Sequence, residues 1–177
     1  MFLILFVPLS IWLGILSPFS PIQRAIDKNF DLITELQNEQ AAFKADTVDI
    51  PDKSTDGGKL ITFKHKHKDY QVMDIWIFGE LGKIHATYWL DKRGKFILVK
   101  RSDFEYDKPY YELDFKSKET TRYLSYKPDK VIGYNKVIGY NNERQELNAA
   151  TSMILKKEYE AFFKDVTNWE KNEVICC

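Results

Sequence analysis

The sequence predicts an α+β fold, in which an antiparallel β-meander of about six strands is packed by an N-terminal and a C-terminal helix. The stretch from Phe78 to Tyr111 supports the meander, because short runs rich in β-branched and aromatic residues alternate there with Gly, Asp and Pro. Amphipathic segments with helical spacing lie on both sides of this stretch. Its connections are too short for a crossover helix, so we expect antiparallel hairpins.

Alternation along the central strand assigns its two faces. One face carries Ile84, Ala86, Tyr88 and Leu90, and the other carries His85, Thr87 and Trp89. A turn is expected at residues 91–94, since Asp favours the first turn position and Gly tolerates positive φ. The next strand begins at Phe96, and Pro109 ends the ladder because it has no N–H to donate.

Residues 1–20 are predicted to be a signal peptide or a membrane anchor, followed by a single α+β domain at 21–177. The apolar run over residues 1–19 has a length that suits the hydrophobic region of a signal peptide. No Lys or Arg precedes the run and no small-x-small cleavage site follows it, so an uncleaved anchor stays open. No cysteine directly follows it, which excludes a lipoprotein signal.

The N-terminal helix is predicted to begin at Ser20 and Pro21, where Ser can cap the helix and Pro suits its first position. Its apolar stripe steps by three and four residues through Ile22, Ile26, Phe30, Ile33, Leu36 and Phe43. We expect this stripe to lie on the sheet. Residues 46–58 are predicted to form a loop.

Further strands are predicted at 59–64, 70–78, 110–116 and 120–127, with a last one beginning at Val131. The last strand lies in a repeat, KVIGYN-KVIGYN, whose even period keeps each side chain on its face. The C-terminal helix is predicted to begin with a cap at Asn142. Its apolar stripe is Leu155, Tyr159, Phe162, Val166 and Trp169.

Turn and aromatic motifs recur in three fragments: STDGGKL, FGELGKIHATYWLDKRGKFILVK and FEYDKPYY. They resemble a group of uncharacterised exported bacterial proteins, which combine an acidic-Gly-Gly loop, a G-E-x-G-K turn, a Y-x-F/L-D strand and a Tyr-x-x-Pro-x-Tyr corner. The matching positions are Asp56, Gly57, Gly58, Gly79, Glu80, Gly82, Lys83, Tyr88, Leu90, Asp91, Tyr106, Pro109 and Tyr111. The resemblance covers roughly the middle half of the chain and implies an exported α+β protein with an antiparallel sheet, but no activity.

Charge and cysteine content exclude some partners. Lys plus Arg equals Asp plus Glu at 26 each, which argues against a nucleic-acid-binding protein. The two cysteines, Cys176 and Cys177, end the chain, so no internal disulfide can stabilise the fold. In an oxidising compartment either thiol could form a disulfide-linked dimer.

Neither a metal site nor a catalytic residue is predicted. His65 and His67 share one face of a predicted strand, but His85 is the only other histidine, and metal sites normally need three or four ligands. No Ser-His-Asp arrangement and no GxSxG motif can be identified, and no cofactor motif is present.

Aromatic residues supply the one candidate binding surface. Tyr and Trp are good recognition residues, because they combine rigid apolar area with a polar tip. If the face of Tyr88 is covered by a helix, Trp89 faces away from it, and neighbouring strands can bring tyrosines to the same side. The predicted surface is therefore Trp89, Tyr106, Tyr111 and Tyr123. The alternative is that tyrosines simply fill the sheet, where β-propensity enriches them.

The favoured hypothesis is an exported cell-envelope protein, in the periplasm or at the cell surface, that binds a protein, peptide or glycan without catalysis. The alternatives are an envelope enzyme of unrecognised type and a structural module tethered through residues 1–19. A flat aromatic face would favour binding, whereas a closed pocket with convergent carboxylates or histidines would favour an enzyme.

Overall fold

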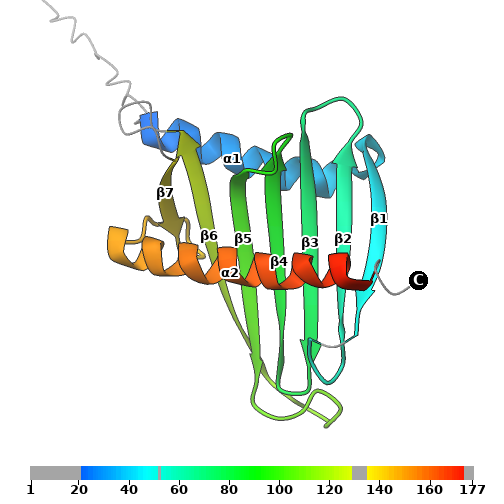
Figure 1. The fold of residues 1–177 in the computed structure, drawn as a ribbon. Helices are drawn as coiled ribbons and strands as arrows, with labels where there is room; N and C mark the ends of the chain where they lie inside the picture. Colours follow the sequence, from blue (N-terminus) through cyan, green and yellow to red (C-terminus); the bar gives the residue numbers. More distant parts are fainter. Residues whose placement is uncertain (1–20, 52, 129–134, 174–177) are drawn as a thin grey trace, which may run out of the picture.

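The computed structural model describes residues 21–51, 53–128 and 135–173. Over these residues the chain forms one seven-stranded antiparallel sheet and two long helices, which confirms the predicted α+β meander (Figure 1). The strand count is one higher than predicted. The proposed signal or anchor segment, the strand start at Val131 and both cysteines lie outside the described residues.

Each strand pairs only with its neighbours along the chain. In order the strands are β1 (Phe43–Ile50), β2 (Gly58–His65), β3 (Tyr70–Gly79), β4 (Gly82–Asp91), β5 (Phe96–Tyr106), β6 (Ser117–Pro128) and β7 (Asn135–Tyr140). The helices are α1 (Pro21–Asn38) and α2 (Ala149–Glu173), and a short 3-10 turn at Gln40–Ala42 joins α1 to β1.

β1 is not among the predicted strands, because the sequence pattern places Phe43 in the helical stripe and residues 46–58 in a loop. β1 lies at the sheet edge and pairs only with β2. Only its end residues Phe43 and Ile50 are buried, and the side chains in between are mostly exposed. An edge strand of this kind carries charged residues on both faces, so no apolar alternation marks it.

Two further predictions are wrong at the level of single elements. Residues 110–116 form the β5–β6 connection rather than a strand, and Asp114 adopts a left-handed φ of 59° there. α2 begins at Ala149, where the side chain of Asn148 accepts a hydrogen bond of 2.8 Å from the Thr151 N–H. Asn142 is therefore not the cap.

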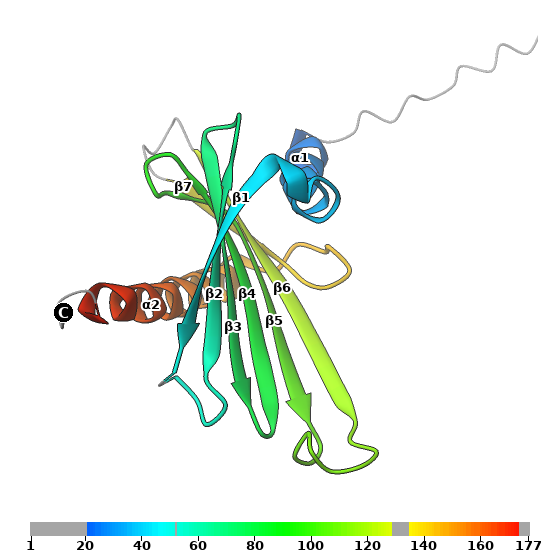
Figure 2. The ribbon, with the colours of Figure 1, turned by 90° about the vertical axis from the view of Figure 1, so that its right-hand side faces the viewer.

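The two helices cover opposite faces of the sheet (Figure 2). On the α2 face, Tyr88, Leu90 and their strand neighbours pack against Leu155, Tyr159 and Val166. The phenol of Tyr88 donates to the carbonyl of Tyr159 at 3.0 Å. The predicted apolar face of the central strand is thus confirmed, as is most of the α2 stripe. The side chain of Trp169 lies outside those described.

The other face is covered by α1 over only part of its length. Phe30 packs with Ile138 and Tyr140 and meets the ring of Tyr123 edge-on at 4.9 Å between centroids. A second cluster joins Phe43, Val72, Trp89 and Leu98 to the α1 residues Ile33 and Leu36. Below α1 the strands continue uncovered toward the β3–β4 and β5–β6 turns (Figure 2).

Candidate functional site

Two turns are bonded together at the lower end of the sheet. The backbone N–H of Tyr106 donates to the carbonyl of Leu81 at 2.9 Å, and that of Tyr110 donates to Glu80 at 3.0 Å. Close approach also requires glycine at Gly82, because a Cβ there would lie 2.2 Å from the carbonyl oxygen of Phe104. The β5–β6 connection is therefore held against the β3–β4 turn by main-chain contacts.

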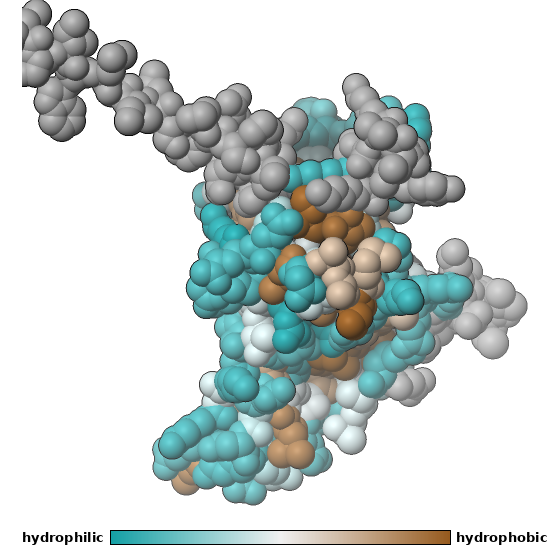
Figure 3. Space-filling model, turned by 90° about the vertical axis from the view of Figure 1, so that its left-hand side faces the viewer, coloured by the Kyte–Doolittle hydropathy of each residue, from teal (hydrophilic) through white to brown (hydrophobic). Residues whose placement is uncertain are grey.

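Apolar side chains gather on these turns. Of the seven large hydrophobic side chains that are exposed in the described part of the chain, five lie here: Leu81 61%, Tyr110 47%, Tyr111 65%, Leu113 86% and Phe115 38% exposed. We name these five residues the apolar tip. Hydrophobic atoms reach the surface at this lower end among hydrophilic ones (Figure 3). Exposed apolar side chains that cluster in this way mark interaction sites in soluble proteins.

A hollow of about 440 Å³ opens beside the apolar tip. It is lined by Asp56, Phe78, Gly79, Lys83, Tyr106, Tyr110 and Phe115. The rings of Tyr106 and Phe115 pack at 5.0 Å between centroids. The hollow therefore combines aromatic walls with one cation and one carboxylate, and it is large enough for a side chain of a partner.

Above the hollow, aromatic rings contact one another through their faces. His85 stacks on Trp76 at 3.7 Å, and Phe78 lies nearly parallel to Trp76 at 6.1 Å. The ammonium of Lys83 lies 5.4 Å from the Trp76 ring centre and 4.7 Å from that of Phe104, within the range of cation–π attraction. Because Trp76 already has these neighbours, its ring offers little free face for a sugar to stack on.

On the sheet face that α1 partly covers, the carboxylate of Asp74 lies at the centre of a group of polar residues. Asp74 Oδ1 is 2.7 Å from both His85 Nε2 and the Thr87 hydroxyl, and Oδ2 accepts from Trp76 Nε1 at 2.9 Å. Burial alone would raise the pKa of Asp74, but the hydrogen bond and charge of His85 and the bonds from Thr87 and Trp76 hold that pKa below its usual 3.8. Asp74 is thus an ionised, fully paired group.

Asp74, His85 and Ser102 on this face do not form a nucleophilic site. Ser102 lies opposite His85 in the β4–β5 ladder, which places Asp, His and Ser on adjacent strands. However, Ser102 is 1% exposed and its hydroxyl pairs with Thr121 at 2.6 Å, while Thr121 donates to Glu119. A buried, paired hydroxyl cannot reach a substrate. The hydrogen bond between Ser102 and Thr121 instead links β5 to β6.

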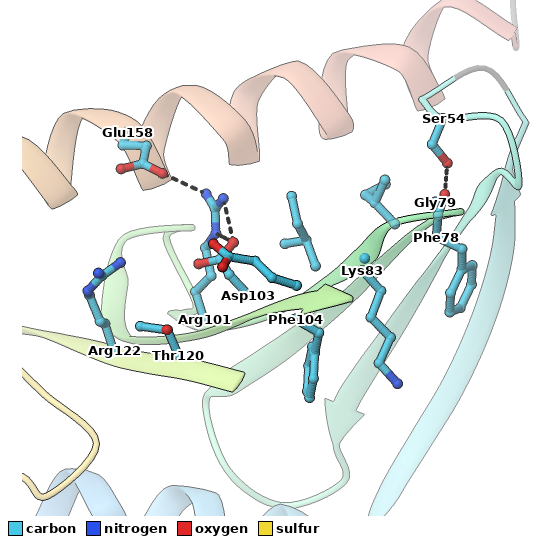
Figure 4. A pocket seen from close by; sticks show the side chains of 14 residues that line it. Ser54, Phe78, Gly79, Lys83, Arg101, Asp103, Phe104, Thr120, Arg122 and Glu158 are labelled. Carbon is cyan, nitrogen blue, oxygen red and sulfur yellow. Dashed lines mark hydrogen bonds and ion pairs between the residues drawn. The ribbon is translucent and has the colours of Figure 1, made fainter. Parts of the chain in front are cut away.

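A second pocket, of about 450 Å³, lies beneath α2 (Figure 4). Arg101 donates from Nη2 to Asp103 at 2.8 Å and from Nη1 to Glu158 of α2 at 3.2 Å. Its guanidinium also lies 5.2 Å from the ring centre of Tyr159 and 5.1 Å from that of Phe162. These contacts engage the guanidinium of Arg101 and connect α2 to β5, so we assign Arg101 a structural role.

The imidazole of His65, near the β2–β3 turn, is engaged with backbone and acidic groups. His65 Nδ1 accepts from the N–H groups of His67 and Lys68 at 3.0 Å each, and its Nε2 lies 3.1 Å from Glu35 of α1. Among the described residues, no three His, Cys, Asp or Glu side chains are grouped so that they could hold a metal ion.

The four predicted site residues do not form one open surface. Trp89 is 1% exposed and packs in the cluster beneath α1, so its assignment to an open face is wrong. Tyr123 is half-buried against Phe30. Tyr106 lines the hollow and Tyr111 belongs to the apolar tip, so only these two lie together at the candidate site.

Sequence reasoning missed most of the candidate site. Leu81, Leu113 and Phe115 are not among the predicted site residues, although Leu81 lies between the glycines of the GELGK turn. An apolar side chain within a turn is the signal that could have identified Leu81, because a turn at the surface rarely buries its side chains.

Comparison of the chain with protein-family models, curated protein sequences and solved structures yields no match. Among the described residues, no helix has both the length and the apolar character that a membrane span requires.

Proposed function

We propose that this chain is a non-catalytic binding module of the cell envelope, which captures an apolar segment of a partner protein at the apolar tip and the adjoining hollow. The observation that carries the proposal is the concentration of exposed apolar side chains on two turns that are bonded to each other. Such preorganisation lowers the entropy cost of binding, because the loop need not be ordered by the partner.

A protein or peptide partner fits this surface better than a glycan. Sugar binding would use free aromatic faces, and those of Trp76 are shared with His85, Phe78 and Lys83. A hollow with aromatic walls and protruding residues such as Leu113 and Tyr111 instead offers an anchor pocket beside apolar contacts. The absence of an accessible nucleophile around Asp74 further favours binding over catalysis.

Site-specific photo-cross-linking in cells tests this function. A photoreactive residue at Tyr111 should yield a discrete adduct that protease digestion shortens. The matched control places it at Ile154 on α2, which is equally exposed at 64% but lies away from the tip. The Leu81→Ser and Leu113→Ser changes together should abolish the adduct from position 111. Equal adducts from both positions, or an adduct that resists protease, would contradict a protein partner at the tip.

Export is part of the same proposal and rests on the apolar run over residues 1–19. Fractionation of cells that express the tagged full chain should place the protein outside the cytoplasm, either released or with the membrane. Recovery of the intact chain in the soluble cytoplasmic fraction would reject the envelope location and leave the binding surface untested by that result.

A further inference from the structure

The apolar tip carries acidic side chains directly beside its two leucines. Glu80 precedes Leu81 in the β3–β4 turn. In the β5–β6 connection, Glu112 and Asp114 stand on either side of Leu113. All five side chains are exposed. None of the ion pairs within the described part of the chain includes these three acids, so each exposed leucine is bordered by carboxylates whose charge is available to a partner.

The lysines of the same two turns are placed differently from these acids. Lys83 is half-buried, and its ammonium lies 4.7 Å from the ring centre of Phe104. Lys108 is half-buried as well. Lys116 is exposed, but it lies beside Asp107, whose side chain accepts a hydrogen bond of 2.7 Å from the Lys116 N–H. Because the whole chain has 26 basic and 26 acidic residues, the excess of exposed acids is a local feature of the tip.

An apolar centre with a charged rim is the usual anatomy of a protein interface. Charges on the rim guide encounter and partner choice, because complementary potentials attract and like charges repel. The hollow beside the tip adds one more exposed carboxylate, that of Asp56. These acids would repel an acidic peptide, and they would also repel the anionic surface of a membrane. The charge pattern therefore favours a partner that combines apolar and cationic groups.

We propose, on the basis of the function proposed above, that the captured segment is a cationic amphipathic peptide, in which Lys or Arg separates the apolar residues. Its apolar side chains would contact Leu81, Leu113 and the walls of the hollow. Its cations would pair with the carboxylates that border the leucines. Since each exposed ion pair is weak by itself, the three carboxylates act together.

Fluorescence anisotropy with two labelled synthetic peptides tests this proposal. In one peptide Leu and Phe alternate with Lys, and in the other Glu replaces every Lys. The full chain should bind the Lys peptide saturably, and about tenfold or more tightly than the Glu peptide. Its affinity should fall as NaCl rises from about 0.05 M to about 0.5 M, because salt screens exposed charges. Equal affinity for the two peptides, or no saturable binding of the Lys peptide, would overturn the proposal.

A charge-neutral variant removes the carboxylates while keeping the size of each side chain. It carries Glu80→Gln, Glu112→Gln and Asp114→Asn, and Asn tolerates the left-handed φ of 59° at position 114. Its affinity for the Lys peptide should be about fivefold or more below that of wild type. The matched control neutralises three exposed acids away from the tip: Asp31→Asn, Asp46→Asn and Glu143→Gln. It should bind like wild type, and equal affinities of the two variants would contradict a role for the tip carboxylates.

Photo-cross-linking from position 111 separates this proposal from the proposed function. The adduct should weaken in the charge-neutral variant and persist in the matched control. An undiminished adduct in the charge-neutral variant would overturn the cationic partner and leave the capture of an apolar segment standing. Absence of any adduct from position 111 in the otherwise wild-type chain would overturn both.

Discussion

The two faces of the sheet differ in what covers them. The α2 face carries the larger apolar cluster, which includes Tyr88, Leu90 and Val99 and is closed by a helix of 25 residues. The α1 face carries two smaller clusters under a helix of 18 residues, and its lower half is open (Figure 2). The comparison indicates that the α2 face mainly stabilises the fold, whereas part of the α1 face has no covering helix and its polar and aromatic groups pair with one another instead.

The largest expected effects come from one buried ring on each face. Tyr159→Ala should lower the free energy of unfolding by about 3–5 kcal/mol, because the ring is 0% exposed and lies against Arg101. Trp89→Ala should cost a similar amount, since Trp89 is 1% exposed beneath α1. Urea unfolding followed by far-UV circular dichroism measures both. A near-silent Trp89→Ala would show that α1 does not cover this face in solution.

Aliphatic truncations should separate the two helices. Leu155→Ala in α2 should cost about 2–5 kcal/mol, because the side chain is 5% exposed within the large cluster. Ile33→Ala in α1 should cost only about 1 kcal/mol, since Ile33 is partly buried. The same urea measurement applies, and an equal loss for the two variants would remove the proposed division between the faces.

The pH dependence of the free energy of unfolding should show how much the Asp74 carboxylate on the α1 face stabilises the fold. The lowered pKa of Asp74 means that the unfolded chain binds its proton at higher pH than the folded chain, so this stabilisation is complete above about pH 5 and is lost as pH falls below 3.8. Asp74→Asn should therefore be less stable than wild type by about 1–3 kcal/mol near neutral pH. The difference should shrink toward pH 2. A difference that does not vary with pH would show that the Asp74 charge is not what stabilises the fold.

The smallest expected effect on stability belongs to the apolar tip. Tyr111→Ser together with Leu113→Ser should change the free energy of unfolding by less than about 0.5 kcal/mol, because both side chains are exposed. The same pair should abolish partner capture, while Met153→Ser with Ile154→Ser, the exposed apolar residues of α2, should not. A large fall in melting temperature for the tip variant would make these residues structural.

The sheet could be predicted from the sequence where alternation is strong. Ile84 and its alternate neighbours share one face of the sheet as expected, which is the face that α2 covers, and the second hexad of the repeat supplies most of β7. β1 escaped prediction because its exposed middle has no apolar face to alternate. Residues 110–116 resembled a strand by β-propensity, but a turn with Asp114 at positive φ replaces it.

The site was harder to predict, because it depends on which face each helix covers. An apolar stripe such as Ile33 and Leu36 requires a partner surface without specifying which side of the sheet supplies it. In the structure α1 packs on the face that carries Trp89, and it buries Trp89 rather than exposing it. Exposure of Leu113 likewise depends on the backbone path of its loop, which Tyr106 and Leu81 fix through a main-chain bond between distant turns.

The strand order carries a consequence for the time course of folding. Each strand pairs only with its neighbours along the chain, so the sheet can grow hairpin by hairpin with short loop closures. α1 is different, because Phe30 packs against Tyr123 and Ile138, about a hundred positions later in the chain. The Phe30 part of the first helix to emerge during synthesis is therefore among the last to dock. Until β6 and β7 exist, Phe30 has no surface to cover, and a chaperone would find its ring exposed during that interval.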